Sequence, residues 1–201
     1  MPQIHLLAIQ LTLMTLEKRC AWVNSDPLYI AYHDQEWGIP VHDDQQLFEL
    51  LILEGFQSGL SWITILRKRD HFREAFDQFD YRKIAQWPEK KLSACLNNPH
   101  IIRNRLKINA VKMNAQAFIN IQEKFGSFDR YIWEFVNYTP IQNHFFSHQE
   151  LPSSTELSLT MSQSLKKHGF KFVGPTICYS FMQAAGLVND HLTECFCYPK
   201  K

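Results

Sequence analysis

The 201-residue chain has no long apolar run and almost no net charge. Crossing a membrane takes about 18 consecutive apolar residues, and because no segment approaches that length, a membrane protein is not expected. The 21 lysines and arginines nearly balance 20 acidic residues, which gives a formal net charge of +1. This balance argues against a sequence-independent coat for nucleic acid, although a local basic surface remains compatible with it.

A framework of disulfides and a secretory signal are also missing. The five cysteines are an odd number, and residues 1–16 lack the basic region and small-residue cleavage site of a signal peptide. A reduced, cytoplasmic and monomeric protein is therefore expected, in which metal binding is favoured over disulfides. Residues 1–16 are predicted to form a disordered or loosely docked extension, unless Met14 is the true start.

Sustained alternation of apolar and polar residues is absent too, whereas helical spacing recurs along the chain. This spacing predicts a buried helix through residues 47–55, capped by Asp43 or Asp44. A longer helix is predicted from Asn98-Pro99 to a stop at Gly126. Further helix starts are predicted at Ser61, Asp70, Pro88, Ser127 and Thr155 or Ser154. An all-α fold follows, with residues 138–155 as its longest loop.

Two cysteine–histidine pairs lie at opposite ends of the chain. Cys20 precedes His33, and His191 precedes Cys195 by four positions, which places the second pair on one face of a predicted helix. Two cysteines and two histidines complete a tetrahedral zinc shell. If the pairs meet, a structural zinc joins the two ends. A catalytic zinc hydrolase is the weaker alternative, because catalytic zinc usually keeps one position open for water.

Large aromatic residues are concentrated beside the first of these pairs. They are Trp22, Tyr29, Tyr32 and Trp37, with Trp62 further along. Glu54 lies near the end of the buried helix, where a charge is costly without a partner. Aromatic rings with one carboxylate suit a planar, electron-poor ligand, above all a cation. The alternatives are core packing for the aromatics and an exposed helix end or a cap for Glu54.

Residues 169–186 indicate a helix end, a tight turn and a new helix. Gly174 permits backbone conformations that a side chain forbids, and Pro175 suits the first turn of a helix. Free N–H groups at Thr176 and beyond, with Lys171 nearby, can bind a phosphate. This pattern looks like a degenerate helix–hairpin–helix motif, which holds a DNA backbone without reading sequence, and taken alone it is a weak signal. An ordinary helical connection remains the alternative.

Taken together, these segments resemble the bacterial DNA-3-methyladenine glycosylase I family over about residues 18–198. The motifs that carry the resemblance are RCAWVNSDPLYIAYHDQEWGIP, LEGFQSGLSWITILRKR, FKFVGPTICYSFMQAAGLVNDH and HLTECFCYP. The resemblance implies a helix–hairpin–helix glycosylase domain over residues 17–198. Within it, residues 17–42 and 187–198 form a zinc-clamped part, and residues 43–186 form the helical body.

The resemblance also implies roles for individual residues. The implied zinc ligands are Cys20, His33, His191 and Cys195. The implied base pocket consists of Glu54, Tyr32 and Trp62, surrounded by Trp37, Trp22 and Tyr29. The implied DNA contacts are Gly59, Leu60, Lys171, Gly174 and Thr176, with Leu60 as a candidate wedge into the duplex. Core packing is the alternative for Leu60, and Arg103, Arg105 and Lys107 face either phosphate or solvent.

The implied reaction is hydrolysis of the N-glycosidic bond of N3-methyladenine in duplex alkylated DNA, after the base leaves the stack. Its products are free 3-methyladenine and an abasic site. Because N3 alkylation makes the purine cationic and a good leaving group, an aspartate that activates water is not required. Asp190 is therefore given no catalytic role. The alternative is a non-catalytic binder of damaged or abasic DNA on the same fold.

Overall fold

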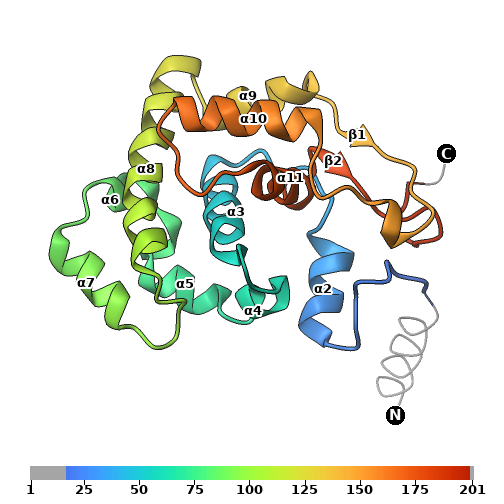
Figure 1. Cartoon of the computed structure of the whole chain (residues 1–201), viewed down its shortest axis with the longest axis horizontal. Helices are drawn as coiled ribbons and strands as arrows, with labels where there is room; N and C mark the ends of the chain where they lie inside the picture. The colour runs from blue at the N-terminus through green and yellow to red at the C-terminus, as the bar shows by residue number, and fades with distance from the viewer. Residues whose placement is uncertain (1–16, 200–201) are drawn as a thin grey trace, which may run out of the picture.

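The computed structural model describes residues 17–199, and most of them are helical (Figure 1). The predicted extension at residues 1–16 lies outside the described residues. The helices are α2 (Pro27–Gln35), α3 (Asp44–Gln57), α4 (Trp62–Leu66), α5 (Arg69–Ala75), α6 (Tyr81–Ala85), α7 (Glu89–Asn97), α8 (Arg105–Phe125), α9 (Phe128–Trp133), α10 (Glu156–Lys167) and α11 (Pro175–Ala184). Short 3₁₀ turns are η1 (Asp77–Phe79), η2 (Glu134–Val136) and η3 (His148–Glu150), and two short strands are β1 (Ile141–Gln142) and β2 (Val188–Asn189). No helix within residues 17–199 is long and apolar enough to cross a membrane.

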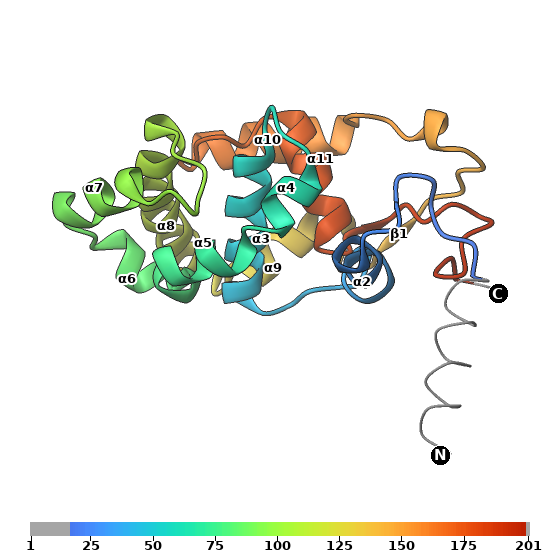
Figure 2. The same cartoon turned by 90° about the horizontal axis from the view of Figure 1, so that it is seen from below.

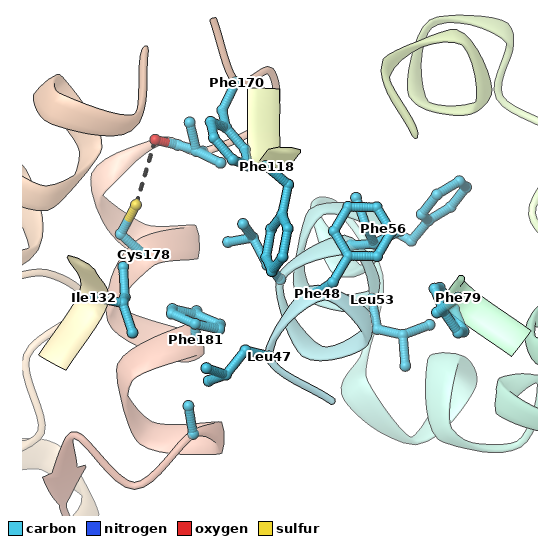
Figure 3. Packing of buried hydrophobic residues seen from close by; sticks show 14 of the residues in the cluster. Leu47, Phe48, Leu53, Phe56, Phe79, Phe118, Ile132, Phe170, Cys178 and Phe181 are labelled. Carbon is cyan, nitrogen blue, oxygen red and sulfur yellow. Dashed lines mark hydrogen bonds between the residues drawn. The ribbon is translucent and has the colours of Figure 1, made fainter. Parts of the chain in front are cut away.

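Helix α3 lies at the centre of the molecule, as its nearly continuous apolar sequence predicted. Helices α5 to α8 lie on one side of it, and α2 lies with the C-terminal segment on the other (Figures 1 and 2). Figure 3 shows Phe48 of α3 beside Phe118 of α8, with ring centroids 5.2 Å apart. Phe181 of α11 belongs to the same core. This packing fixes α3 relative to both halves of the chain.

Most of the predicted helix caps are confirmed. The side chain of Asp43 accepts a hydrogen bond from the backbone N–H of Gln46 at 2.9 Å. Ser127 caps α9 in the same way, and Thr155 forms a reciprocal capping box at the start of α10. Ser61 occupies the cap position of α4, but its hydroxyl pairs with the hydroxyl of Thr64 instead of the backbone. The side chains of Asp43, Ser127 and Thr155 thus satisfy N–H groups that a helix start leaves unpaired.

The structure differs from the sequence-based assignment in several elements. The long helix α8 begins only at Arg105, capped by Asn104, so the residues directly after Pro99 form a connection. Helix α2 was not predicted, although Asp26 and Pro27 supply a cap and a first-turn proline for it. The predicted loop 138–155 contains strand β1, which pairs in parallel with β2. The mostly helical class is confirmed, with this two-residue pairing as its departure from all-α.

The segment that follows α2 lies directly against the end of α11. The N–H of Gly38 donates to the carbonyl of Gln183, and that of Val41 to Ala185, both at 3.0 Å. Gly186 has φ +70°, and a Cβ built on it would lie 2.3 Å from the carbonyl carbon of Ile39. Only glycine therefore allows the two backbones to approach this closely.

We expect Gly186→Ala to destabilise the protein by about 4 kcal/mol or more, because the new methyl group meets backbone that cannot rotate away. Gly126→Ala is the matched control, since Gly126 has φ +95° with nothing within 4 Å of its Cβ position. Backbone strain alone should cost the control about 1–3 kcal/mol. Denaturant unfolding measures the free energy of unfolding of both variants. Equal losses of stability would show that the close approach of Gly186 to Ile39 does not contribute to stability.

Candidate functional site

A cavity of about 350 Å³ opens between α2, α3, α4 and α11. All five predicted aromatics and Glu54 line it, although they come from separate parts of the chain. The full lining is Trp22, Tyr29, Tyr32, Trp37, Glu54, Gln57, Trp62, His148, Leu151, Pro152, Ser153, Ser180 and Gln183. The structure thus brings together the residues that the sequence analysis grouped as a base pocket.

Glu54 is the most unusual group in this cavity. It is 2% exposed, and its Oε2 has no hydrogen-bond partner among the described residues. The indole Nε1 of Trp62 lies in the same cavity and also lacks a partner there. Burial alone raises the pKa of Glu54 to about 8. The alternative of an exposed helix end or cap for Glu54 is therefore wrong, and two buried polar atoms remain available to a ligand.

The aromatic rings form adjoining walls of the cavity. The ring centroids of Tyr32 and Trp62 lie 5.3 Å apart. Trp22 contacts Tyr29 at 4.9 Å and Trp37 at 5.1 Å, with tilted or edge-on geometry. Tyr32 and Trp37 are buried, whereas Trp22 and Tyr29 are half-buried. Desolvation, followed by the charge of Glu54, raises the pKa of Tyr32, so its hydroxyl stays protonated and can donate.

Several cavity residues were not predicted. Ser180 and Gln183 face the cavity from α11, and their spacing of three places both on one face of the helix. That spacing was readable, but nothing in the sequence indicated which face of α11 meets the cavity. The segment around η3 supplies further lining from the long loop. Because its residues lack periodicity, its position depends on tertiary contacts that the sequence does not reveal.

The four predicted metal ligands converge at the other side of the aromatic cluster. The thiols of Cys20 and Cys195 and one ring nitrogen each of His33 and His191 all lie within 4.8 Å of one another, and all four residues are buried. Cys195 Sγ lies 3.5 Å from His33 Nε2 and from His191 Nδ1. Cys20 Sγ lies 3.7 Å from His191 Nδ1. This cluster can hold a metal ion.

The remaining ring nitrogen of each histidine is held by a neighbouring group. His33 Nδ1 lies 2.7 Å from Asp34 Oδ1, and Asp34 also binds the guanidinium of Arg19. His191 Nε2 lies 3.1 Å from the backbone carbonyl of Trp37. Contacts of this kind select the tautomer that leaves the other nitrogen free to bind a metal. Asp34 was not singled out from the sequence, although it directly follows His33.

The local structure around the second pair differs from the prediction. His191 and Cys195 do not share a helix face, because residues 190–199 form turns after β2. A turn brings Cys195 back, with its N–H donating to the carbonyl of Leu192 at 2.8 Å. Four-residue spacing is compatible with either geometry.

The turn between α10 and α11 is built differently from the expectation. Gly174 has φ −65° and open space around its Cβ position, so it does not supply an unusual conformation. The left-handed conformation falls on Phe172, at φ 56°. Lys171 is held by its backbone, because Asn114 exchanges two hydrogen bonds with it. Thr176 lies in the first turn of α11, which has no side-chain cap.

The predicted wedge lies at an exposed turn between α3 and α4. Leu60 is 41% exposed, so its alternative, core packing, is wrong. Gly59 precedes it with φ +81° and open space around its Cβ position. Arg103 and Arg105 are exposed. Lys107 faces neither phosphate nor solvent: it is 7% exposed, and its ammonium donates to the carbonyls of Phe56 and Ser58 at the end of α3.

The sequence matches the model of the methyladenine glycosylase family over residues 22–198. The chain belongs to this family. It is 50% identical over 182 residues to DNA-3-methyladenine glycosylase 1 of Escherichia coli (strain K12), covering 90% of this chain and 97% of that relative. A crystal structure of 3-methyladenine DNA glycosylase I superposes with a TM-score of 0.89 at 52% identity, covering 90% of this chain and 100% of that one. A variant of 3-methyladenine DNA glycosylase I in complex with 3-methyladenine superposes with a TM-score of 0.88 at 37% identity, covering 90% and 98%. The family membership inferred from the sequence motifs is thereby confirmed.

Burial of Glu54 should make stability depend on pH. Because its pKa rises from 4.5 to about 8 on folding, the folded protein binds more protons than the unfolded chain between these values. The free energy of unfolding therefore falls as pH rises through this window, by up to about 5 kcal/mol. Glu54→Gln removes this pH-dependent loss of stability. Near pH 4.5 the free energy of unfolding of the variant should equal that of wild type, and towards pH 8 it should become increasingly larger than that of wild type. Denaturant unfolding across this range checks it, and parallel curves for the two proteins would refute a buried, unpaired carboxyl group.

Proposed function

We propose that this protein excises N3-methyladenine from alkylated duplex DNA by hydrolysing the N-glycosidic bond, releasing the free base and leaving an abasic site. The observation that carries the proposal is the unpartnered carboxyl group of Glu54, buried in a cavity walled by aromatic rings. The bound 3-methyladenine of the structural relative supports the same ligand class. The cavity volume also suits a single base.

The cavity can recognise a flipped, alkylated purine from several sides. Aromatic rings attract a cationic base more strongly than a neutral one, because the positive charge meets the negative face of the ring. Trp62 stacks on the base in this proposal, and its partner Tyr32 donates from a hydroxyl that stays protonated. Glu54 accepts hydrogen bonds from the polar edge of the base.

The protonation of Glu54 follows the charge of the ligand. With a pKa of about 8, the carboxyl group is mostly neutral in the free protein at neutral pH. A cationic base beside it favours the ionised form and lowers that pKa. The resulting ion pair forms only with a positively charged base, so normal adenine gains much less binding free energy from Glu54. The same buried group that destabilises the fold thus selects the damaged base.

The chemical step needs little catalysis by the protein, because the alkylated purine is positively charged and is therefore already a good leaving group. The ionised Glu54 supplies negative charge near the positive charge that moves towards the sugar as the bond breaks. Asp190 does not act as a water-activating base in this proposal. It is 1% exposed, and three side-chain donors already occupy its carboxylate.

DNA is proposed to lie across the mouth of the cavity. The exposed Leu60, on its glycine-containing turn, enters the gap that the flipped nucleotide leaves. The uncapped start of α11 at Gly174 and Thr176 offers backbone N–H groups to a phosphate, and Lys171 adds charge next to it. In this proposal α10, the turn and α11 act as the helix–hairpin–helix unit of the protein. A monomer suffices, since one chain supplies every proposed contact.

The metal of the buried cluster is proposed to be zinc in a structural role. Zinc bonds of about 2.3 Å to sulfur and about 2.0 Å to nitrogen set the sulfur–nitrogen edges of a tetrahedron at about 3.5 Å. The observed edges of 3.5 to 3.7 Å fit that shell. Zinc bound here supplies a cross-link without an open position for water. Cys20 and His33 thereby fasten the chain that carries Trp22 and Tyr32 to the C-terminal segment.

Base release tests the proposed reaction. Wild-type protein should release 3-methyladenine from methylated duplex DNA, as measured by chromatography of the free base. Glu54→Gln should lower single-turnover release by at least about tenfold, because an amide cannot form the ion pair. Glu49→Gln is the matched control: it lies on the same helix, pairs with Arg73 outside the cavity, and should keep wild-type release.

The alternative function is a non-catalytic binder of damaged DNA. It makes the opposite prediction, in which wild-type protein binds abasic-site DNA tightly and releases no base. That result would reject the glycosylase proposal while leaving the fold and the cavity intact. Full activity of Glu54→Gln would instead remove Glu54 from the site.

Metal analysis tests the zinc proposal. Purified protein should contain about one zinc per chain, and Cys195→Ser should lose it because one of four ligands is gone. Cys95→Ser is the control, since Cys95 is also buried but lies outside the cluster. It should retain the metal. A fully stable wild-type protein without metal would contradict the structural role.

A further inference from the structure

A buried carboxylate holds one residue of the cavity wall in a fixed orientation. Gln183 lines the cavity from α11, and its side-chain Nε2 donates to Asp190 Oδ2 at 2.8 Å. The same carboxylate accepts hydrogen bonds from the hydroxyl of Tyr179 and from Asn143 Nδ2, both at 2.6 Å. With donors on both oxygens, Asp190 is held from three sides.

This contact decides which end of the Gln183 amide is free. Both oxygens of Asp190 already act as acceptors, so the carboxyl group pairs with the NH₂ group of the amide and not with its carbonyl oxygen. Rotating the amide by half a turn would set Oε1 against Oδ2. Gln183 therefore directs Oε1 away from Asp190, and no donor within residues 17–199 is bonded to that oxygen. The cavity wall presents a fixed hydrogen-bond acceptor.

We propose that Gln183 determines specificity by accepting a hydrogen bond from the amino group of the bound base through Oε1, and that Asp190 is its positioning residue. This inference rests on the proposed function, because it concerns the ligand of the same cavity. It adds a second acceptor, on α11, to the carboxyl group of Glu54 on α3.

The chemistry of purines gives this acceptor a discriminating role. A 6-aminopurine carries two N–H hydrogens on its exocyclic nitrogen, whereas a 6-oxopurine carries a carbonyl oxygen at the same position. Opposite a 6-oxopurine, two acceptors meet, and neither can rotate to donate because Asp190 fixes the Gln183 amide. A site whose buried polar group is left unpaired rejects the wrong ligand strongly. The cavity should thus prefer 6-amino over 6-oxo bases.

Calorimetric binding of two free bases to the full-length protein tests the proposal. The probes are 3-methyladenine and its 6-oxo counterpart, 3-methylhypoxanthine. Gln183→Met keeps the length of the side chain but removes the acceptor. The ratio of its dissociation constants for 3-methylhypoxanthine and 3-methyladenine should therefore fall by about tenfold relative to wild type. Tyr179→Phe is the matched control: it removes another donor to the same oxygen of Asp190 but leaves Gln183 held, and the preference should stay at the wild-type value.

Asp190→Asn tests the positioning role. An asparagine can present either end of its amide, so Gln183 is free to turn, and the preference should narrow as much as in Gln183→Met. In the double variant, the preference for 3-methyladenine over 3-methylhypoxanthine should fall no further than in either single variant, because the two substitutions remove the same interaction. Metal content and helical circular dichroism are measured alongside, since Asp190 adjoins the ligand His191. If Asp190→Asn loses its metal, Gln183→Met alone decides.

An unchanged preference in Gln183→Met would overturn the proposal, as would additive losses in the double variant. Reduced single-turnover release by Gln183→Met, with both affinities unchanged, would also overturn it, because the amide would then act on the attacking water and not on the base. These results are distinguishable from failure of the proposed function. In that case the wild-type protein itself would bind neither base and release none.

Discussion

The cost of burying a carboxyl group without a partner dominates the organisation of this protein. Glu54 lies in the last turns of the central helix, where α2, α4 and α11 remove water from it. A fold selected for stability alone would place an apolar or amide side chain here. In the proposed function, this position is explained by a ligand that brings positive charge and N–H groups. Glu54 therefore favours ligand binding in this proposal but lowers the stability of the fold, and the packing around it offsets this loss of stability.

The constituents of the site could be predicted from the sequence more readily than their geometry. Aromatic density, the buried glutamate and the two cysteine–histidine pairs are properties of residue type and spacing, and the structure does bring each set together. The turn at Cys195 was not predictable, because four-residue spacing fits a helix and a turn equally. Gln183 was missed for a related reason: periodicity shows that a helix has faces, but not which face meets a cavity.

Lys107 shows the same limit for charged residues. In the sequence it belongs to a basic group with Arg103 and Arg105, which suggested a surface for phosphate. In the structure its ammonium closes the end of α3 by binding two backbone carbonyls, and burial lowers its pKa. The lysine thereby ties α8 to the turn that carries Leu60. A count of positive side chains overstates the charge available to DNA, and the salt dependence of binding should be correspondingly shallower.

The meeting of Cys20 and His33 with His191 and Cys195 has a consequence for how the protein is made. Cys20 and Cys195 are separated by nearly the whole sequence, so their meeting closes a long loop and depends on contacts that form slowly. During synthesis Cys20 and His33 emerge long before their partners His191 and Cys195. The segment that carries Trp22 and Tyr32 therefore cannot be joined to His191 and Cys195 until these two residues have been synthesised. Because residues from Trp22 to Gln183 line the aromatic cavity, this cavity can take its shape only after most of the described chain has been made.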